Sequence, residues 1–307
     1  MSHTTPSSGC LSISVVLLMA FAATACDKKR DQDPAPRTAH DCLTDSTCRN
    51  VMVVAHRGHN AIHPENSLAA IRAAAELGCD YAELDVRHTA DDRLILMHDG
   101  TVDRTTDATG DVESFTWAEI QTLTLLGGVP GNPESTDVPE FFAALALARE
   151  VGIMLYVDQK TDRTDLVLAD IAAGGYYEVA LVRDDLTRVA PMAASDAELL
   201  VMPPIADGDE LAAAIAAVPG LRVVEIARVT PDAALTAQIL GAGLQAQQDV
   251  MVDGDGLAAM SGDYRGWKAY IDAGVQLLQT NFPELLVPAV EQYNRTGVFP
   301  DQGPGAL

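Results

Sequence analysis

Short apolar segments alternate with longer helical ones from Val51 almost to the C-terminus. The predicted strands are 51–55, 81–86, 94–98, 153–158, 179–183, 199–202, 222–226, 244–247 and 275–280. The helices expected between them or after them are 64–77, 116–123, 141–150, 165–173, 211–218, 233–240 and 284–292. Alternation of this kind over roughly 245 residues predicts an α/β protein with a (β/α)₈ TIM barrel, a fold of about 250 residues.

The nine predicted strands exceed the eight places of such a barrel, so one is misassigned or belongs to an extra hairpin. An open doubly wound sheet is the alternative fold. It is disfavoured because the chain has neither a GxGxxG motif nor a phosphate-binding P-loop after a strand.

The N-terminus has the pattern of an export signal. Residues 1–25 contain no charged side chain, and Leu11–Ala25 is an apolar run too short to span a bilayer. The run ends at a small-x-small sequence before Cys26, which resembles a lipidation site. We expect an exported protein, periplasmic or at the cell surface as a lipoprotein and otherwise secreted.

The expected domains are a signal peptide (1–25), a disordered tether (26–50), the barrel (51–296) and a C-terminal tail (297–307). The tether is polar and contains Cys42 and Cys48, for which a small disulfide loop is plausible outside the cytoplasm. Cys79 follows a helix-ending glycine and is expected to be a buried thiol.

The formal net charge of −24 excludes a basic nucleic-acid footprint. The charge also disfavours binding to an anionic membrane, except through an N-terminal lipid anchor. An anionic small molecule can bind only where a metal ion or a few placed Arg and Lys residues make the site locally positive.

Three acidic residues are predicted to meet at one end of the barrel. Glu83 and Asp85 are separated by one residue on a strand, so their side chains point the same way, and Asp158 ends another strand. The carboxyl ends of barrel strands form a common face. A divalent cation offsets the repulsion among buried carboxylates, and hard oxygen ligands favour Ca²⁺ or Mg²⁺. The alternative is a solvated strand end without an ion.

Five of the seven histidines lie between His56 and His98, both of which end predicted strands. Imidazoles act as general acids or bases near neutral pH. Arg57 offers a bidentate anchor for phosphate oxygens, and Lys160 can hold an anionic oxygen.

Two other hydrolytic sites are disfavoured. A zinc site built from His56, His59 and His63 lacks further ligands at standard spacing. A serine hydrolase lacks the GxSxG elbow.

Several motifs together resemble the glycerophosphodiester phosphodiesterase family. They are His56-Arg57-Gly58, Pro64-Glu65-Asn66-Ser67, Glu83-Leu84-Asp85-Val86, Leu96-Met97-His98-Asp99 and Asp103-Arg104-Thr105-Thr106 with Gly110. The similarity is densest from Val53 to about Leu123. It continues through Val157-Asp158-Gln159-Lys160 and ends at 274–283.

The resemblance implies a TIM-barrel phosphodiesterase that uses one divalent cation to hydrolyse glycerophosphodiesters to sn-glycerol 3-phosphate and an alcohol. It implies His56 and His98 as the catalytic acid/base pair. It further implies Glu83, Asp85 and Asp158 as metal ligands, Arg57 and Lys160 as phosphate contacts, and Glu65 near the metal or His56.

Three positions depart from the family pattern. Asp158 replaces a Glu, Asn281 stands where an Asp is common, and 244–247 replaces a Trp-containing strand. Two alternative functions follow: a phospholipase D-like or phosphoinositide-cleaving barrel that acts on a lipid, and a non-catalytic surface lipoprotein that binds a ligand.

Overall fold

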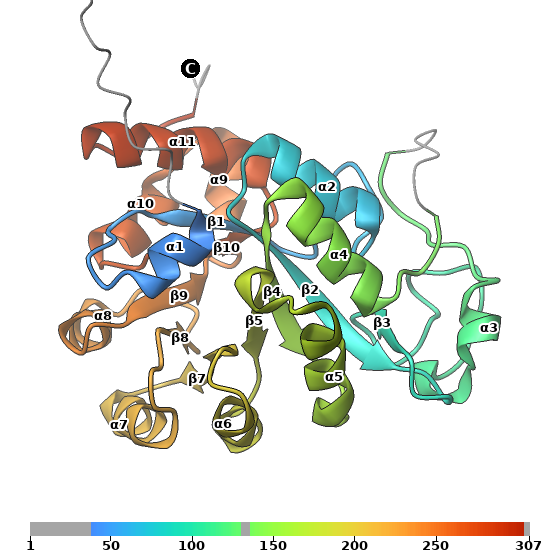
Figure 1. Ribbon diagram of the computed structural model, residues 1–307. Coiled ribbons are helices and arrows are strands. Elements are labelled where there is room, and N and C mark those ends of the chain that lie inside the picture. The colour runs from blue at the N-terminus through green and yellow to red at the C-terminus, as the bar shows by residue number, and fades with distance from the viewer. Residues whose placement is uncertain (1–37, 130–135, 304–307) are drawn as a thin grey trace, which may run out of the picture. The chain divides into compact units, whose positions relative to one another are not determined.

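The computed structural model describes residues 38–129 and 136–303. Its central feature is a parallel sheet in the order β6-β5-β4-β2-β1-β10-β9-β8-β7 (Figure 1). The strands are β1 (Met52–Ala55), β2 (Tyr81–His88), β4 (Met154–Gln159), β5 (Ala180–Arg183), β6 (Leu200–Met202), β7 (Pro204–Ile205), β8 (Val223–Ile226), β9 (Gln245–Asp249) and β10 (Leu277–Thr280).

Pro203 alone separates β6 from β7, so the two short strands fill one place in the sheet. β6 pairs with β5, and β7 pairs with β8. Proline has no N–H to donate to a strand ladder, which accounts for the interruption. The sheet therefore closes on itself with eight places, and the predicted TIM barrel is confirmed.

β3 (Leu94–Leu96) lies outside the barrel and runs antiparallel to the far end of β2. Val86 pairs with Leu96, and His88 pairs with Leu94. The predicted strand 94–98 is thus the surplus one, and it forms an extra hairpin with the end of β2. This was one of the two explanations that the sequence left open.

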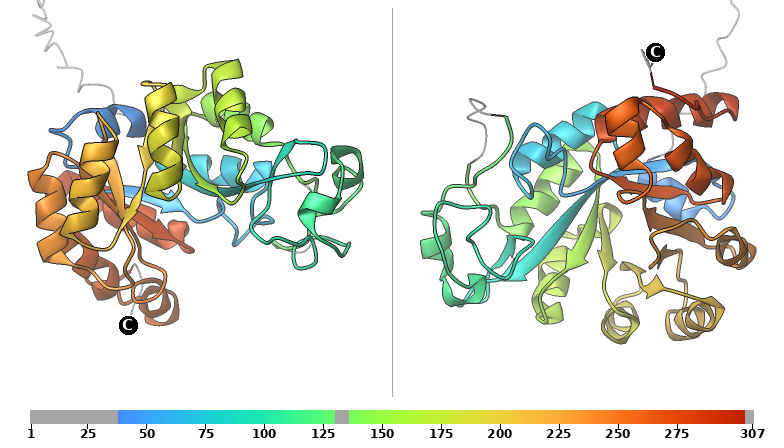
Figure 2. Two further views of the ribbon diagram at one scale, coloured as in Figure 1. Left: turned by 90° about the horizontal axis from the view of Figure 1, so that it is seen from below. Right: turned by 180° about the vertical axis from the view of Figure 1, so that it is seen from behind.

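The helices after β1 are α2 (Leu68–Leu77), α3 (Trp117–Ile120), α4 (Phe141–Val151), α5 (Thr164–Gly174), α6 (Leu186–Ser195), α7 (Gly208–Ala217), α8 (Ala233–Gly241), α9 (Asp255–Ser261), α10 (Arg265–Asp272) and α11 (Pro283–Thr296). All of these helices except α3 surround the barrel, and α3 lies to one side of it in the segment after β3 (Figure 2). The helix expected to begin at Pro64 begins at Leu68, because the Ser67 hydroxyl accepts from the backbone N–H of Ala70 and caps the first turn. Helices α6, α9 and α10 were not predicted.

Side chains alternate between two apolar layers along each strand. On β1, Val53 packs outward against the helices, whereas Met52 and Val54 belong to a cluster inside the barrel with Tyr81, Tyr156 and other strand residues. Every second residue toward the carboxyl end of a strand continues this inward face. The inward face therefore changes from apolar to polar at the carboxyl ends of the strands.

The amino end of the barrel is closed by a short helix, α1 (Ala39–Thr44). Thr38 caps this helix, and Cys42 forms a disulfide with Cys48. Cys42, Leu43 and Cys48 are buried in the inner cluster. The side-chain amides of Gln245 and Gln276 donate to the carbonyls of Cys42 and Cys48, at 2.8 and 3.3 Å.

The expectation of a disordered tether through residue 50 is therefore wrong for residues 38–50. Apolar Cys42, Leu43 and Cys48 are buried in the barrel, which the polar composition of the segment concealed. The signal peptide, Cys26 and the rest of the tether lie outside the described residues.

Two further sequence predictions concern Cys79 and the C-terminal tail. Cys79 is a buried free thiol, as predicted. In the predicted tail, Phe299 is buried and its ring lies 6.5 Å from that of Tyr264, so the described part packs on the barrel. Among the helices of the described residues, none has the length and apolar character needed to cross a membrane.

Candidate active site

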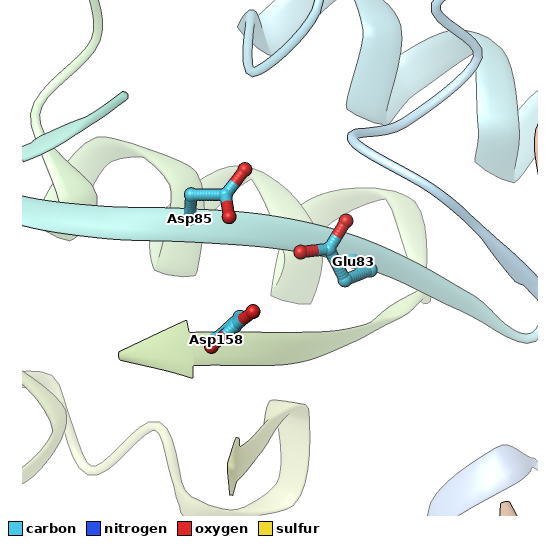
Figure 3. A group of neighbouring side chains, drawn as sticks. All are labelled: Glu83, Asp85 and Asp158. Atoms are coloured by element: carbon cyan, nitrogen blue, oxygen red, sulfur yellow. The ribbon is translucent and has the colours of Figure 1, made fainter. Parts of the chain in front are cut away.

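Three carboxylates meet at the carboxyl ends of β2 and β4. Glu83 and Asp85 face inward from β2, and Asp158 lies beside Asp85 in the parallel pairing with β4. One oxygen of each carboxylate lies within 4.8 Å of the others (Figure 3). The sequence prediction that these three side chains converge is confirmed.

The three carboxylates of the triad lie close enough to shift the pKa values of neighbouring groups. Burial, reinforced by Asp85 and then Asp158, raises the pKa of Glu83 well above its ordinary value. Lys160 Nζ lies 2.6 Å from Asp158 and 3.5 Å from Asp85. Burial alone would lower the pKa of Lys160, but the charges of Asp158, Asp85 and Glu83, together with the hydrogen bond to Asp158, outweigh it and the net shift is upward. The site thus concentrates negative charge around Lys160.

The loop after β1 wraps over the triad. The backbone N–H of Arg57 donates to Glu83 at 2.8 Å, and Arg57 Nε lies 3.6 Å from Asp85. Arg57 and Gly58 both adopt positive φ, at 55° and 74°, which turns the chain sharply enough to aim this N–H at the carboxylate. The Arg57 guanidinium also donates to Glu65 at 2.8 Å.

Asn66 fixes the orientation of Asp85. Its side-chain amide donates to the Asp85 carboxylate at 2.9 Å, and its oxygen accepts from the Asp85 backbone N–H at 2.9 Å. Asn66 is buried and has a φ of 56°. Asn66 lies in the motif Pro64-Glu65-Asn66-Ser67, but its contacts with Asp85 were not predicted from the sequence.

His56 extends inward from the end of β1. Its Nδ1 lies 2.7 Å from the amide oxygen of Asn281, and its Nε2 lies 3.9 Å from Glu83. Burial is the main cause that lowers the pKa of His56. The ring is therefore neutral at neutral pH, with Nε2 directed toward the triad.

His98 reaches the same mouth by a different route from the one expected. It follows β3 of the hairpin, which returns along β2 so that the N–H of Met97 donates to the carbonyl of Asp85. His98 Nδ1 lies 2.7 Å from Asp99. The hairpin, rather than a barrel strand, delivers this imidazole.

A chain of ion pairs joins His98 to the loop after β1. Arg104 donates to Asp99 at 2.7 Å and to Glu65 at 2.7 and 2.8 Å, and Glu65 accepts from Arg57. Glu65 thus contacts two arginines, and its negative charge acts on nearby His56 in the direction that raises the pKa of the imidazole. It lines a pocket of about 350 Å³ together with His56, Arg104 and Asn281.

The zinc alternative finds no support in the described ranges. Within 38–129 and 136–303, the carboxylate triad is the one group of three or more acidic, His or Cys side chains close enough to share an ion. His59 instead lies 3.3 Å from Glu284.

On the β5 side of the mouth, the structure shows polar residues that sequence reasoning missed. Arg183 lies 3.6 Å from Asp158 and is paired with Glu225 at 2.5 Å. Asp249 follows on β9, and burial followed by the charge of Glu225 raises its pKa to about 6. Inward alternation from the strand ends is the signal that could have found them.

A parallel barrel with an acidic triad and imidazoles at its carboxyl mouth defines a TIM-barrel protein whose triad could hold a metal ion. Residues 56–187 match the sequence model described as the Glycerophosphoryl diester phosphodiesterase family. The matched segment contains the triad, His56 and His98, so the site described above lies in the part of the chain that is similar to this family.

Curated relatives align with a segment of the chain. The segment is 51% identical over 72 residues to "Glycerophosphodiester phosphodiesterase" of Caldanaerobacter subterraneus subsp. tengcongensis, covering 24% of this chain and 30% of that protein. It is 49% identical over 73 residues to "Glycerophosphodiester phosphodiesterase 1" of Homo sapiens, covering 24% and 22%. The aligned part thus spans less than a third of either relative.

Solved structures share the fold over most of the chain. A glycerophosphodiester phosphodiesterase from Agrobacterium tumefaciens is 27% identical with a TM-score of 0.61, over 76% of this chain and 97% of that one. A glycerophosphoryl diester phosphodiesterase from Parabacteroides distasonis is 16% identical with a TM-score of 0.69, over 87% and 94%. An Oleispira antarctica phosphodiesterase solved with the product sn-glycerol-3-phosphate is 18% identical with a TM-score of 0.61, over 78% and 96%.

Proposed function

We propose that this protein hydrolyses glycerophosphodiesters to sn-glycerol 3-phosphate and an alcohol, with one divalent cation and with His56 and His98 as the acid/base pair. The observation that carries the proposal is the triad of Glu83, Asp85 and Asp158, which meets within 4.8 Å beside a neutral imidazole. The names of the aligned relatives, and the product bound to the Oleispira antarctica phosphodiesterase, support the same substrate class.

The donor set fits a hard divalent cation. Three carboxylates offer oxygen ligands of the kind that Ca²⁺ and Mg²⁺ prefer, and the buried Glu83 is costly to ionise without a positive partner. When bound, such an ion supplies Lewis-acid stabilisation of the negative charge that develops on the phosphate. Arg57 and Lys160 surround the triad and are assigned to bind phosphate oxygens.

His56 is assigned as the base. With Nδ1 donating to Asn281, its unprotonated Nε2 is free to take a proton from water or from a neighbouring substrate hydroxyl. The lowered pKa of His56 keeps this nitrogen unprotonated at neutral pH.

His98 is assigned as the acid. The Asp99 carboxylate accepts from Nδ1–H and fixes the ring, so Nε2 is the nitrogen that can protonate the departing alcohol. Arg104 restrains Asp99 in turn, because its guanidinium donates to that carboxylate at 2.7 Å.

Single substitutions test these assignments. His56→Ala and His98→Ala should each lower kcat by at least a hundredfold on glycerophosphodiesters, while leaving the melting temperature nearly unchanged, because general acid and base contributions are typically about 10²–10⁴-fold. His40→Ala, in the helix that closes the other end of the barrel, is the matched control. Full activity in either site variant would end its assignment.

Removal of the metal tests the triad. A chelator should abolish activity, and Ca²⁺ or Mg²⁺ should restore it in the wild type but not in Glu83→Gln. Undiminished turnover in the metal-free protein would contradict the proposal. Parallel assays on soluble diesters and on lysophospholipid micelles distinguish it from the lipid-cleaving alternative.

We also propose export with Cys26 as the lipid attachment site, supported by the uncharged apolar leader that ends at this residue. Metabolic labelling with a radioactive fatty acid should mark the full-length chain and not Cys26→Ser. Equal labelling of both would refute the assignment of Cys26.

A further inference from the structure

Arg183 occupies a place in the mouth that the proposed mechanism does not use. It ends β5 and lies beside Asp158 in the parallel pairing of β5 with β4. Leu181, two residues earlier, belongs to the cluster inside the barrel, so Arg183 also faces inward. Its side chain is 26% exposed, which leaves it accessible from the mouth.

Glu225 holds the guanidinium from across the barrel. Arg183 Nε and Nη2 donate to the two carboxylate oxygens of Glu225, at 2.5 and 3.2 Å. Glu225 is 8% exposed, and the Tyr156 hydroxyl donates to it at 3.4 Å. A buried bidentate pair of this kind fixes the plane of an arginine side chain.

The strand between these two partners offers no competing polar side chain. At this level Arg183 pairs with Met202 of β6, which belongs to the inner apolar cluster, and Glu225 pairs with Pro204 of β7. Neither Met202 nor Pro204 carries a charged group that would compete for Arg183 or Glu225. The Arg183 side chain therefore reaches from β5 to Glu225 on β8, across the position that β6 and β7 share.

One edge of the guanidinium remains for a ligand. Nη1 lies 3.6 Å from Asp158 Oδ1, beyond hydrogen-bond distance, and it donates to no other residue in the described part of the chain. This edge borders the triad on the β5 side, whereas Arg57 borders it on the β1 side. Two planar donors thus flank the place where an anion held at the triad would lie.

We propose that Arg183 is a further phosphate-binding residue, positioned by Glu225, that contacts the phosphodiester from the side opposite Arg57. The inference rests on the proposed function, since it places the substrate phosphate at the triad. Glu225 also lines a pocket of about 540 Å³ with Val229, Asp249 and Val252, which gives space for one ester group beyond Arg183.

The test compares Arg183→Gln with Arg183→Lys and with Arg149→Gln. Arg149 also pairs with a glutamate, but on α4 and away from the mouth, so it is the matched control. Calorimetry measures the Kd of sn-glycerol 3-phosphate for the metal-loaded protein and, separately, the Kd of the cation. Steady-state assays at saturating cation give KM and kcat for a glycerophosphodiester.

Arg183→Gln should raise KM and the Kd of sn-glycerol 3-phosphate about tenfold or more, as expected for loss of a charge-assisted hydrogen bond. It should change the Kd of the cation little. Its melting temperature should fall because buried Glu225 loses its partner, and the Arg183→Gln/Glu225→Gln double variant should recover much of that loss. Arg183→Lys should give values of KM and of the Kd of sn-glycerol 3-phosphate between those of the wild type and Arg183→Gln, because lysine keeps the charge but not the bidentate pairing. Arg149→Gln should match the wild type.

Glu225→Gln tests the positioning role. This substitution should also raise KM and the Kd of sn-glycerol 3-phosphate, by a smaller factor than Arg183→Gln. The Arg183→Gln/Glu225→Gln double variant should raise both constants no more than Arg183→Gln alone, because the two residues act as one unit.

A Kd for sn-glycerol 3-phosphate within twofold of wild type in Arg183→Gln would overturn the inference, as would a weakened cation site with unchanged phosphate binding. A wild-type protein that cleaves no diester but binds sn-glycerol 3-phosphate through Arg183 would refute the proposed function alone.

Discussion

Asn66 shows how one residue fixes the orientation of a buried carboxylate. It makes two hydrogen bonds with Asp85, one to the carboxylate and one from the backbone N–H, and both are buried. Outer-shell partners of this kind orient the groups that bind a metal and are worth about 10–100-fold in affinity. Asn66 also adopts a positive φ, which asparagine tolerates better than most residues.

We expect Asn66→Gly to weaken Ca²⁺ or Mg²⁺ binding about tenfold or more, measured by calorimetry, because Asp85 loses its orienting partner. Glycine keeps the positive φ without strain, so the comparison with Asn66→Ala separates the two effects. Both variants should lose cation affinity alike, and Asn66→Ala should unfold at a lower temperature. Unchanged cation affinity in both variants would show that Asp85 keeps its orientation without Asn66.

Asp80 makes stability depend on pH. It lies before β2, where the backbone N–H of Val53 donates to it at 2.8 Å. Burial raises its pKa from 3.8 to about 6. The folded protein therefore binds the proton more tightly than the unfolded chain, so the free energy of unfolding falls as pH rises from about 4 to about 6.

Asp80→Asn removes this dependence and keeps an oxygen to accept from Val53. We expect the variant to be more stable than wild type by about 1–2 kcal/mol at pH 7, after allowance for partial exposure, and to lose the advantage below pH 4. Urea unfolding at several pH values measures it. A stability difference that stays constant across this range would contradict the assignment.

Much of the site was predictable at the residue scale, because inward alternation and strand ends place Glu83, Asp85 and Asp158 together without any knowledge of loops. Asn281 and Arg183 were harder to place. The role of Asn281 depends on contact with His56 across the β1–β10 pairing, and Arg183 reaches Glu225 over an intervening strand. Neither relation has a fixed spacing in sequence.

At the scale of elements, the connection from β1 to α2 depends on a close approach. Gly58 has a φ of 74°, and a Cβ at this position would lie 2.7 Å from the backbone carbon of Ala70 in α2. The same approach lets the N–H of His59 donate to the carbonyl of Ala70. Only glycine satisfies both the backbone angle and the space.

Gly58→Ala should therefore destabilise the protein more than Gly152→Ala. Gly152 has a φ of 76° but open space around its Cβ position, so alanine there costs only the backbone strain of about 1–2 kcal/mol. The clash at Gly58 should add about 1–3 kcal/mol. Thermal unfolding of the two variants gives the difference directly, and equal losses would mean that α2 shifts freely.

The sequence predicted whether a segment is a helix or a strand where its apolar periodicity is strong. It did not predict which strands pair with each other. The segment that contains β3 has the composition of a barrel strand, yet it pairs antiparallel with the protruding end of β2. Only the length of β2, which continues to His88 beyond its barrel partners, makes that hairpin possible. Helix α6 escaped prediction because Pro191 lies inside it, where proline usually ends a helix.

At the scale of the whole molecule, the disulfide between Cys42 and Cys48 secures the segment that closes the amino end of the barrel. Closing so short a loop removes chain entropy worth about 2 kcal/mol from the unfolded state. A reductant should lower the melting temperature by several degrees while activity at 25 °C stays near wild type, because the triad lies at the other end of the strands.

Cys42→Ala/Cys48→Ala is the matched control for this prediction. The double variant should melt at the lower temperature with or without reductant, since the remaining described cysteine, Cys79, is a free thiol. A reductant effect that persists in the double variant would show that the lost stability comes from elsewhere in the chain.

Because α1 and the apolar cluster fill the amino end of the barrel, the carboxylates in the described part of the chain face solvent at the carboxyl mouth. Under the proposed hydrolysis, each substrate molecule enters by this mouth and both of its products leave by it. A product that stays bound there blocks the next substrate, so product release would limit the turnover rate.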